Sequence, residues 1–358
     1  MTVSVVMSTY NDAAYLAESI ESVLSQDFAD FEFVIVNDGS PDPRTAEILT
    51  RYSTLDPRIR VVTTQNAGLT RALIDGCAVA PGAYVARLDV GDVMTPERLR
   101  RQAEVLDQRP DVSFVSCWTE FCGPEWEHLW TEKGSAHKAG TPECRMPNVE
   151  CRMTKGDGEE PGAGSPNPTS DLRPPTSTVP AVWAANVLPD TPGENLKAGP
   201  THHGSVMMRR HAYEAAGGYR WQFYYGQDWD LWYRLAEQGL FAVVPEVLYR
   251  VRLLPGGISA HNSSRQEVIG RCSLEAFTLR RQCLDQSPAL ERAAAIRPQN
   301  GRHRPPWTWE RAGGWYFLGA TLYRTRDPRC RNYLRRALRT CPYHLKAWVL
   351  LGLSLRLR

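Results

Sequence analysis

The sequence predicts an α/β protein with a doubly wound, mostly parallel sheet and a helical C-terminal extension. Three observations support this prediction. Short apolar runs alternate with amphipathic helical segments over residues 1–117, acidic residues follow two of these runs directly, and the region from about residue 256 has only helical patterning. Strands separated by helices of this length require crossover connections, which are right-handed and produce a parallel sheet.

Five apolar runs in the first 117 residues have the length and composition of buried strands. They cover residues 3–8, 31–37, 59–63, 84–88 and 112–116. Four segments between them place apolar residues on one helical face. These predicted helices cover residues 13–26, 43–52, 69–79 and 96–108, and two of them open with proline, which suits the first helical turn. We interpret residues 1–117 as the first half of one domain.

The regular alternation stops near residue 118, and we expect an insertion or long loop over 118–199. Cys144 and Cys151 lie there with His137, and a zinc site is conceivable, although the spacing matches no familiar ligand pattern. Patterning returns with a predicted strand at 204–208, helices at 210–216 and from Gln227, and strands at 241–244 and 247–251. Residues 200–255 are therefore expected to complete the same domain.

Residues 256–358 are expected to form a helical extension. The pattern Trp-x-x-Leu-Gly begins at Trp315 and recurs at Trp348, an offset of 33 residues. This spacing resembles the tetratricopeptide unit, which implies an interaction surface or a cap; the alternative is a helical hairpin packed on the domain. Arginines in this region could contact a protein partner or anionic lipid, or form a solvated helix face.

The overall composition argues against a nucleic-acid-binding, membrane-spanning or secreted protein. Lys+Arg number 42 and Asp+Glu 40, so the charge balance gives no support for nucleic-acid binding. No run approaches the ~18 apolar residues of a membrane span, and we see no secretion signal. Nine cysteines occur without a Cys-x-x-Cys pair, which favours a reduced compartment. The expected location is cytoplasmic, with the inner face of a membrane as a further option.

Acidic residues follow two predicted strands. Asp38 follows the second strand, and Asp89 and Asp92 follow the fourth, with Gly91 allowing a sharp bend between them. Ligands bind beyond the carboxyl ends of strands in open α/β sheets, so these residues could face one nucleotide and a divalent cation. Oxygen ligands suit Mg²⁺ or Mn²⁺. The alternatives are a structural turn at Asp38 and a helix cap at Asp92.

A second acidic cluster lies at the start of a later helix. Asp228 and Asp230 flank Trp229 in an aromatic-rich segment. The helix dipole would stabilise both carboxylates, so capping is one interpretation. Aromatic surroundings would instead desolvate a carboxylate and raise its pKa toward that of a general base. Of the neighbouring pair His202 and His203, we expect His203 to contact substrate or metal, or else to be structural.

Ordered motifs make the chain resemble the family 2 glycosyltransferases, which have the GT-A fold. The matching segments are 3–11, 22–28, 36–40, 66–70, 82–89, 96–99, 217–219 and 227–234. The resemblance implies metal-assisted, inverting transfer of a hexosyl or N-acetylhexosaminyl group from a nucleotide-diphosphate donor, expected to be a UDP-sugar, to an acceptor hydroxyl. It further implies a saccharide or lipid-linked acceptor and a role in polysaccharide or glycolipid synthesis. Residues 1–117 would then be the nucleotide-sugar-binding half of the domain, and residues 200–255 the acceptor-side half.

The resemblance also implies residue roles. Donor-nucleotide positions are Thr9, Asp38, Asn66 and Asp89, and metal positions are Asp89 and Asp92. The base is Asp228, with Asp230 as second candidate. Apart from the resemblance, the aromatic segment and the histidine pair make Trp229 and His203 candidates for lining the acceptor pocket. The chain departs from the family pattern at Gly91 and Gln227, where acidic residues are common. These departures leave open a catalytically degenerate scaffold. A sugar nucleotidyltransferase is disfavoured, because residues 8–11 are not a glycine-rich loop.

Overall fold

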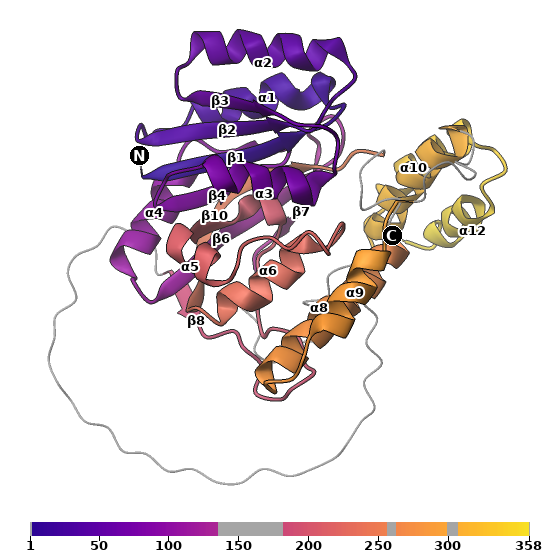
Figure 1. Cartoon of the computed structure of the whole chain (residues 1–358). Coiled ribbons are helices and arrows are strands. Elements are labelled where there is room, and N and C mark those ends of the chain that lie inside the picture. The colour runs from indigo at the N-terminus through magenta and orange to yellow at the C-terminus, as the bar shows by residue number, and fades with distance from the viewer. Residues whose placement is uncertain (1, 135–181, 256–262, 299–306, 358) are drawn as a thin grey trace, which may run out of the picture.

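The computed structural model describes residues 2–134, 182–255, 263–298 and 307–357. Its centre is a ten-stranded sheet with helices on both faces, and the C-terminal helices lie to one side of it (Figure 1). The zinc hypothesis for Cys144, Cys151 and His137 falls outside the described residues.

The first half follows the predicted alternation. Its elements are β1 (Val3–Thr9), α1 (Ala13–Leu24), β2 (Phe31–Asn37), α2 (Pro43–Leu55), β3 (Ile59–Thr63), α3 (Leu69–Val79), β4 (Tyr84–Arg87), β5 (Val93–Met94), α4 (Arg98–Gln108) and β6 (Val112–Cys122). Strands β3, β2, β1 and β4 are adjacent and parallel in that order. Their apolar side chains alternate between the two faces, so that Val5 and Val6 enter different cores.

The second half adds short strands and helices to the same sheet. These are β7 (His128–Glu132), β8 (Trp183–Ala185), the 3₁₀ helix η2 (His203–Ser205), β9 (Met207–Arg209), α5 (Arg210–Ala215), α6 (Gln227–Ala236) and β10 (Leu240–Arg252). The whole order is β3-β2-β1-β4-β9-β6-β10-β5, with β7 on β6 and β8 on β10. Strand β9 runs antiparallel to both neighbours, so the sheet is mixed at its centre.

The doubly wound arrangement is confirmed by the two cores. Helices α1, α2 and α4 cover one face of the sheet, and helices α3, α5 and α6 cover the other. Both cores are built mainly from aliphatic strand residues that are excluded from water.

Several predicted elements differ from the observed ones. The predicted strand at 204–208 is divided between η2 and β9. The predicted strands at 241–244 and 247–251 form the single strand β10, whose register shifts between Val244 and Val247 around Pro245, a residue without an N–H to donate. Strands β7 and β8 and the end of β6 fall within the predicted insertion, so part of 118–199 belongs to the sheet.

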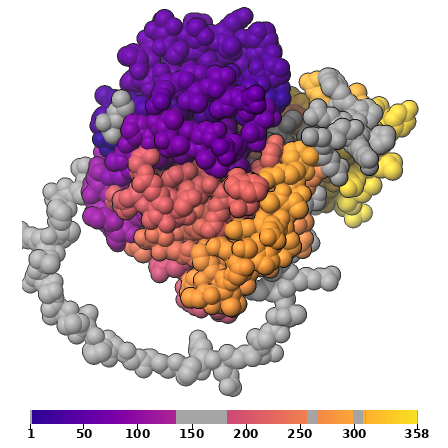
Figure 2. Space-filling view, in the orientation of Figure 1, coloured from indigo at the N-terminus to yellow at the C-terminus, as the bar shows by residue number. Residues whose placement is uncertain are grey.

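The C-terminal region is helical, as predicted. It comprises α8 (Ser263–Arg281), α9 (Ser287–Ala295), α10 (Trp307–Arg324), α11 (Cys330–Thr340) and α12 (Leu345–Ser354). Helices α8 and α9 pack on the segment before α6, and helices α10 and α11 pack on β7. In Figure 2 these last helices project beside the body of the molecule. None of the helices that the structure describes has the length and apolar character required to cross a bilayer.

Candidate functional site

The carboxyl end of β2 organises a loop through Asp38. Its side chain is buried and accepts hydrogen bonds from the backbone N–H groups of Ala67 (2.8 Å) and Gly68 (2.9 Å). The Asn66 amide donates to the Asp38 carbonyl at 3.1 Å and to its carboxylate at 3.2 Å. The structure therefore brings the two predicted nucleotide residues together, and it gives Asp38 a structural role in positioning the loop before α3.

An unpaired hydroxyl lies beside this loop. Thr9, the last residue of β1, is 1% exposed, and its Oγ1 has no hydrogen-bond partner among the described residues. Its carbonyl accepts from the Asp38 N–H at 3.0 Å, which ties the ends of β1 and β2 together. A buried hydroxyl without a partner carries a free-energy cost, so this position suits a polar ligand group.

The second acidic motif forms a tight turn after β4. Gly91 has φ +97°, a conformation that side chains disfavour, and the Asp92 N–H donates to the Asp89 carbonyl at 3.2 Å. Ser19 of α1 holds the turn by accepting from the Gly91 N–H (2.9 Å) and donating to the Asp92 carbonyl (2.8 Å). Gly91, where the chain departs from the family pattern, is thus the residue that lets the backbone turn so that Asp92 lies near Asp89.

His202 completes a cluster with these two carboxylates. One potential ligand atom from each of Asp89, Asp92 and His202 lies within 4.8 Å of the others. His202 Nδ1 is 3.7 Å from an Asp92 oxygen and 4.0 Å from an Asp89 oxygen. Nδ1 also accepts from the Gly204 N–H at 3.1 Å, so ligation through this atom would replace that bond.

The electrostatics of the cluster favour a cation. Burial, followed by the nearby charge of Asp89, raises the pKa of Asp92 well above its ordinary value. Burial also acts to raise the pKa of Asp89, but Arg87 and the two neighbouring histidines together hold it below the ordinary value. A divalent ion would offset the repulsion between the carboxylates, and their oxygen atoms are the donors that Mg²⁺ and Mn²⁺ prefer. The residues present therefore fit a divalent metal.

Tyr249 of β10 contacts every member of the cluster. Its hydroxyl donates to Asp92 at 2.9 Å and accepts from the Asp89 N–H at 3.1 Å. Its ring stacks on His202 with centroids 5.6 Å apart, and the Arg98 guanidinium lies over the ring. The side chain is fully buried. Sequence reasoning missed Tyr249, because only the pairing of β10 with β5 and β6 brings residue 249 to the β4 turn.

The two histidines of the predicted pair have different environments in the structure. His203 is buried and pairs with the Tyr219 hydroxyl at 2.7 Å, and burial, reinforced by Arg87, lowers its pKa to about 3. His203 therefore packs as a neutral core residue, while His202 faces the carboxylates. The backbone decides this, because η2 begins at His203 and turns adjacent side chains in different directions.

Asp228 lies in the first turn of α6. Its side chain is half-buried, and Oδ1 accepts a local hydrogen bond from the Trp229 N–H at 3.0 Å. Burial raises its pKa to about 6, and the charge of Asp89 adds to the rise, which means that the two carboxylates are near enough to interact. A carboxylate of this kind is ionised at neutral pH and can accept a proton.

The Asp230 carboxylate has a structural environment. It is 1% exposed, and Arg234 binds one oxygen at 2.5 Å while Arg220 lies 3.5 Å from the other. Both oxygens are engaged inside the protein, so the geometry does not support the second-base interpretation. Trp229 is half-buried and packs against Trp232, with ring centroids 5.3 Å apart.

The aromatic segment before α6 connects the two acidic regions. Tyr224 packs against Gly68, where a side chain would collide with its ring. Burial raises the pKa of the Tyr224 hydroxyl, and the charge of Asp38 adds to the rise. Thr70 donates to the Phe223 carbonyl at 2.6 Å. The segment that leads to Asp228 is thus held against the Asp38 loop.

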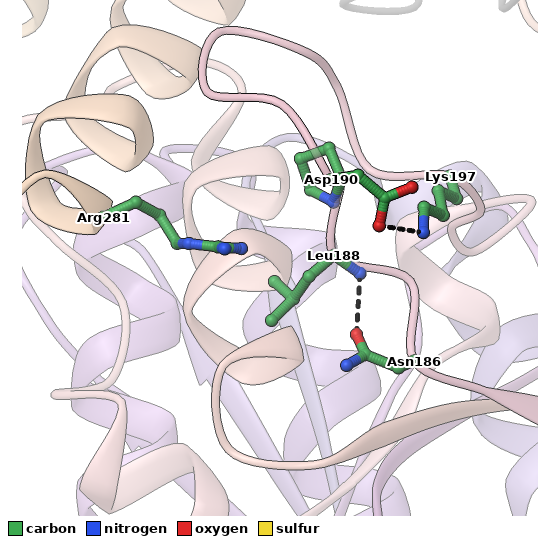
Figure 3. A pocket seen from close by; sticks show the side chains of 6 residues that line it. Asn186, Leu188, Asp190, Lys197 and Arg281 are labelled. Atoms are coloured by element: carbon green, nitrogen blue, oxygen red, sulfur yellow. Dashed lines mark hydrogen bonds and ion pairs between the residues drawn. The ribbon is translucent and has the colours of Figure 1, made fainter.

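A separate hollow lies away from these residues. It has a volume of about 330 Å³ between the loop at residues 186–197 and the end of α8, and Arg281 reaches into it (Figure 3). Asp190 and Lys197 form an ion pair at 2.8 Å on its rim. None of the acidic-site residues lines this hollow.

The chain is similar in sequence to known glycosyltransferases. Residues 4–151 match the model of glycosyl transferase family 2. An uncharacterized glycosyltransferase of Haemophilus influenzae is 25% identical over 280 residues, covering 77% of this chain and 73% of the relative. The putative glycosyltransferase EpsE of Bacillus subtilis is 28% identical over 257 residues, covering 70% and 72%. Other matches are partial: the aligned region spans 13% of the uncharacterized protein y4gI of Sinorhizobium fredii and 42% of the uncharacterized glycosyltransferase MJ1057 of Methanocaldococcus jannaschii.

The fold also has solved counterparts. The crystal structure of an S. aureus TarS fragment in complex with UDP superposes with a TM-score of 0.50 at 15% identity, covering 99% of this chain and 90% of that one. A TarS structure in complex with UDP-GlcNAc gives a TM-score of 0.50 at 14% identity, with the same coverage. These likenesses confirm the predicted GT-A-type fold.

Proposed function

We propose that this chain transfers a sugar from a UDP-sugar to an acceptor hydroxyl with inversion, because residues 4–151 match the model of glycosyl transferase family 2. The TarS structures that share its fold were solved with UDP and UDP-GlcNAc, which supports a uridine nucleotide and a hexosyl or N-acetylhexosaminyl donor. The proposed acceptor is a saccharide, free or lipid-linked, as in polysaccharide or glycolipid synthesis.

The donor nucleotide would lie at the ends of β1 and β2. The unpaired Thr9 hydroxyl would bind a polar group of the base or ribose. The loop that Asp38 and Asn66 hold in place would flank the same ligand. This placement follows the rule that open α/β sheets bind ligands beyond the carboxyl ends of their strands.

The donor diphosphate would lie at Asp89 and Asp92. These carboxylates, with His202 beside them, would hold Mn²⁺ or Mg²⁺. When bound, such an ion neutralises the charge that develops on the departing diphosphate. The residues themselves fix the site, since Ser19 holds the Gly91 turn and Tyr249 donates to the Asp92 carboxylate and accepts from the Asp89 N–H.

Asp228 would act as the general base. The acceptor O–H loses its proton to the Asp228 carboxylate as the oxygen bonds to the anomeric carbon. The bond from that carbon to the diphosphate oxygen breaks on the opposite face, so the configuration inverts. The half-buried Trp229 and the aromatic residues before α6 would orient the sugar and exclude water.

One observation carries this proposal: Asp89, Asp92 and His202 form one cluster that could hold a cation, and the charge of Asp89 adds to the burial that raises the pKa of Asp228 to about 6. The alternative is a degenerate transferase fold that serves as a scaffold. Gln227 favours it, because an acidic side chain beside the base is absent. Gly91 does not, because it permits the turn that joins Asp89 and Asp92.

The test is donor-dependent release of UDP from a panel of UDP-sugars, with and without Mn²⁺. We expect Asp228→Asn to bind donor but to lose turnover by a factor of ~10² or more. Asp190→Asn is the matched control, because that carboxylate is 87% exposed on the remote hollow. Absence of both donor binding and turnover in the wild-type protein would support the scaffold instead.

A further inference from the structure

The last helix, α12, has apolar side chains on its outward face as well as on its inward face. The inward face buries Ala347 and Ser354 and partly buries Leu350 and Leu351. The outward face presents Leu345 (75% exposed), Trp348 (54%) and Val349 (64%), and Leu353 and Leu355 are also exposed. These residues recur at helical spacing, so they form one continuous face. A helix that is solvated on one side normally has polar residues on its outward face.

The exposed aromatic ring is held in a fixed orientation. Trp348 Nε1 donates to the Pro342 carbonyl at 2.8 Å, which anchors the indole at the start of the helix. The end of the helix is held by Arg331, which donates to the Ser354 carbonyl at 2.8 Å. The outward face is therefore a fixed feature of α11 and α12, and no described residue packs over it.

The surroundings of this face are strongly cationic. Residues 328–358 contain eight Lys and Arg and no Asp or Glu. Arg335 and Arg339 are exposed, with no ion pair to any described carboxylate. They line a shallow groove with Leu338, Trp348 and Leu351, so cationic and apolar side chains share one surface.

We propose that the outward face of α12, with Arg335 and Arg339, binds the surface of an anionic phospholipid bilayer. Leucine, valine and tryptophan side chains enter the boundary between headgroups and acyl chains, while arginines bind lipid phosphates. The ten residues of α12 give a length of about 15 Å, which suits a helix lying in the interface. The C-terminal helices stand at the edge of the molecule, where a flat surface can reach them (Figure 2).

A bilayer fits better than an acidic peptide. The apolar side chains extend over the full width of the outward half of α12, whereas the groove beside Trp348 is shallow. A bilayer surface accepts such a face without a complementary shape, and it supplies many phosphates for unpaired cations. Binding of this kind needs neither donor nor metal, so it stands independently of the transferase proposal.

The experiment is co-sedimentation of the full chain with vesicles of phosphatidylcholine alone and of phosphatidylcholine with 30% phosphatidylglycerol. We expect binding to the anionic vesicles only, weakened by added salt. Arg335→Gln with Arg339→Gln should lower the partition coefficient about 25-fold, because each cation near an anionic surface contributes roughly fivefold. Leu345→Ser with Val349→Ser should lower it at least about tenfold.

Matched controls lie on the transferase half. Leu55→Ser removes an apolar side chain that is 66% exposed, and Arg44→Gln with Arg71→Gln removes two exposed cations. Both controls should bind vesicles as the wild type does. Thermal unfolding checks that each variant is folded. If the Leu345→Ser, Val349→Ser variant does not fold, the Arg335→Gln, Arg339→Gln variant still tests the proposal.

Three results would overturn the proposal. The first is equal binding to both vesicle types. The second is binding that the α12 and α11 variants leave unchanged. The third is the absence of vesicle binding. If, in that case, sedimentation velocity shows self-association that Leu345→Ser with Val349→Ser abolishes, a second copy of the chain covers the face.

Discussion

Replacing Asp228 with asparagine should remove activity and add stability. The side chains have the same shape, and the hydrogen bond from the Trp229 N–H can be kept. The change removes the proton acceptor, so we expect turnover to fall by a factor of ~10² or more. It also removes a charge that the folded protein disfavours.

The size of the stability gain follows from the pKa. The folded value of about 6 lies about two units above the ordinary 3.8, which corresponds to roughly 3 kcal/mol at full effect. Because water reaches the half-buried carboxylate, we reduce this to ~1–2 kcal/mol. Ionisation destabilises the folded protein fully above pH 6, and this cost decreases as the pH falls toward 3.8. Asp228→Asn should therefore be more stable than wild type at pH 7 and nearly equal to it at pH 4.

Two measurements check this reasoning. Urea denaturation at pH 7 and pH 4 gives the difference in the free energy of unfolding, with Asp190→Asn as the control. The wild-type rate should rise about tenfold between pH 5 and pH 7, because the ionised fraction at Asp228 rises from about 0.1 to about 0.9. Equal stability at both pH values, or turnover by Asp228→Asn with an unchanged pH profile, would refute the assignment.

Three further outcomes are expected. Tyr249→Phe should weaken Mn²⁺ binding by calorimetry about 10-fold or more, because Asp92 loses the group that orients it, while the thermal midpoint changes little. Asp89→Asn should abolish the Mn²⁺-dependent part of donor binding, and equal donor affinity with and without metal in the wild type would contradict this. Asp230→Ala should destabilise the protein by about 3–5 kcal/mol in urea denaturation, since it leaves Arg234 buried without its partner.

The sequence was most informative where structure depends on local pattern. Apolar periodicity predicted the alternating strands and helices of the first half, because each βαβ unit is determined by neighbouring segments. It could not predict β9 or the register of β10, since short strands are defined by partners far along the chain. Tyr249 reaches Asp92 only through this long-range pairing, so no local signal marks it.

In the candidate site, too, local sequence pattern predicted some features, and others depend on the folded structure. The acidic turn at Asp89 and Asp92 and the first-turn carboxylate Asp228 were predicted, because both stand at element ends with recognisable flanking residues. The choices between His202 and His203 and between Asp228 and Asp230 depend on which way each side chain points. That direction is decided by η2 and by the ion pair with Arg234, which only the folded structure provides.

The placement of β9 has a consequence for how the chain can be divided. This three-residue strand lies between β4 and β6 and pairs with both, although the residues it pairs with are more than 90 positions away in the sequence. A fragment that ends before residue 200 would leave both neighbouring strands with open edges, which promotes aggregation. The region that carries the family signature therefore cannot serve as an autonomous module: expression of residues 1–134 should yield insoluble material, and co-expression with residues 182–358 should restore solubility.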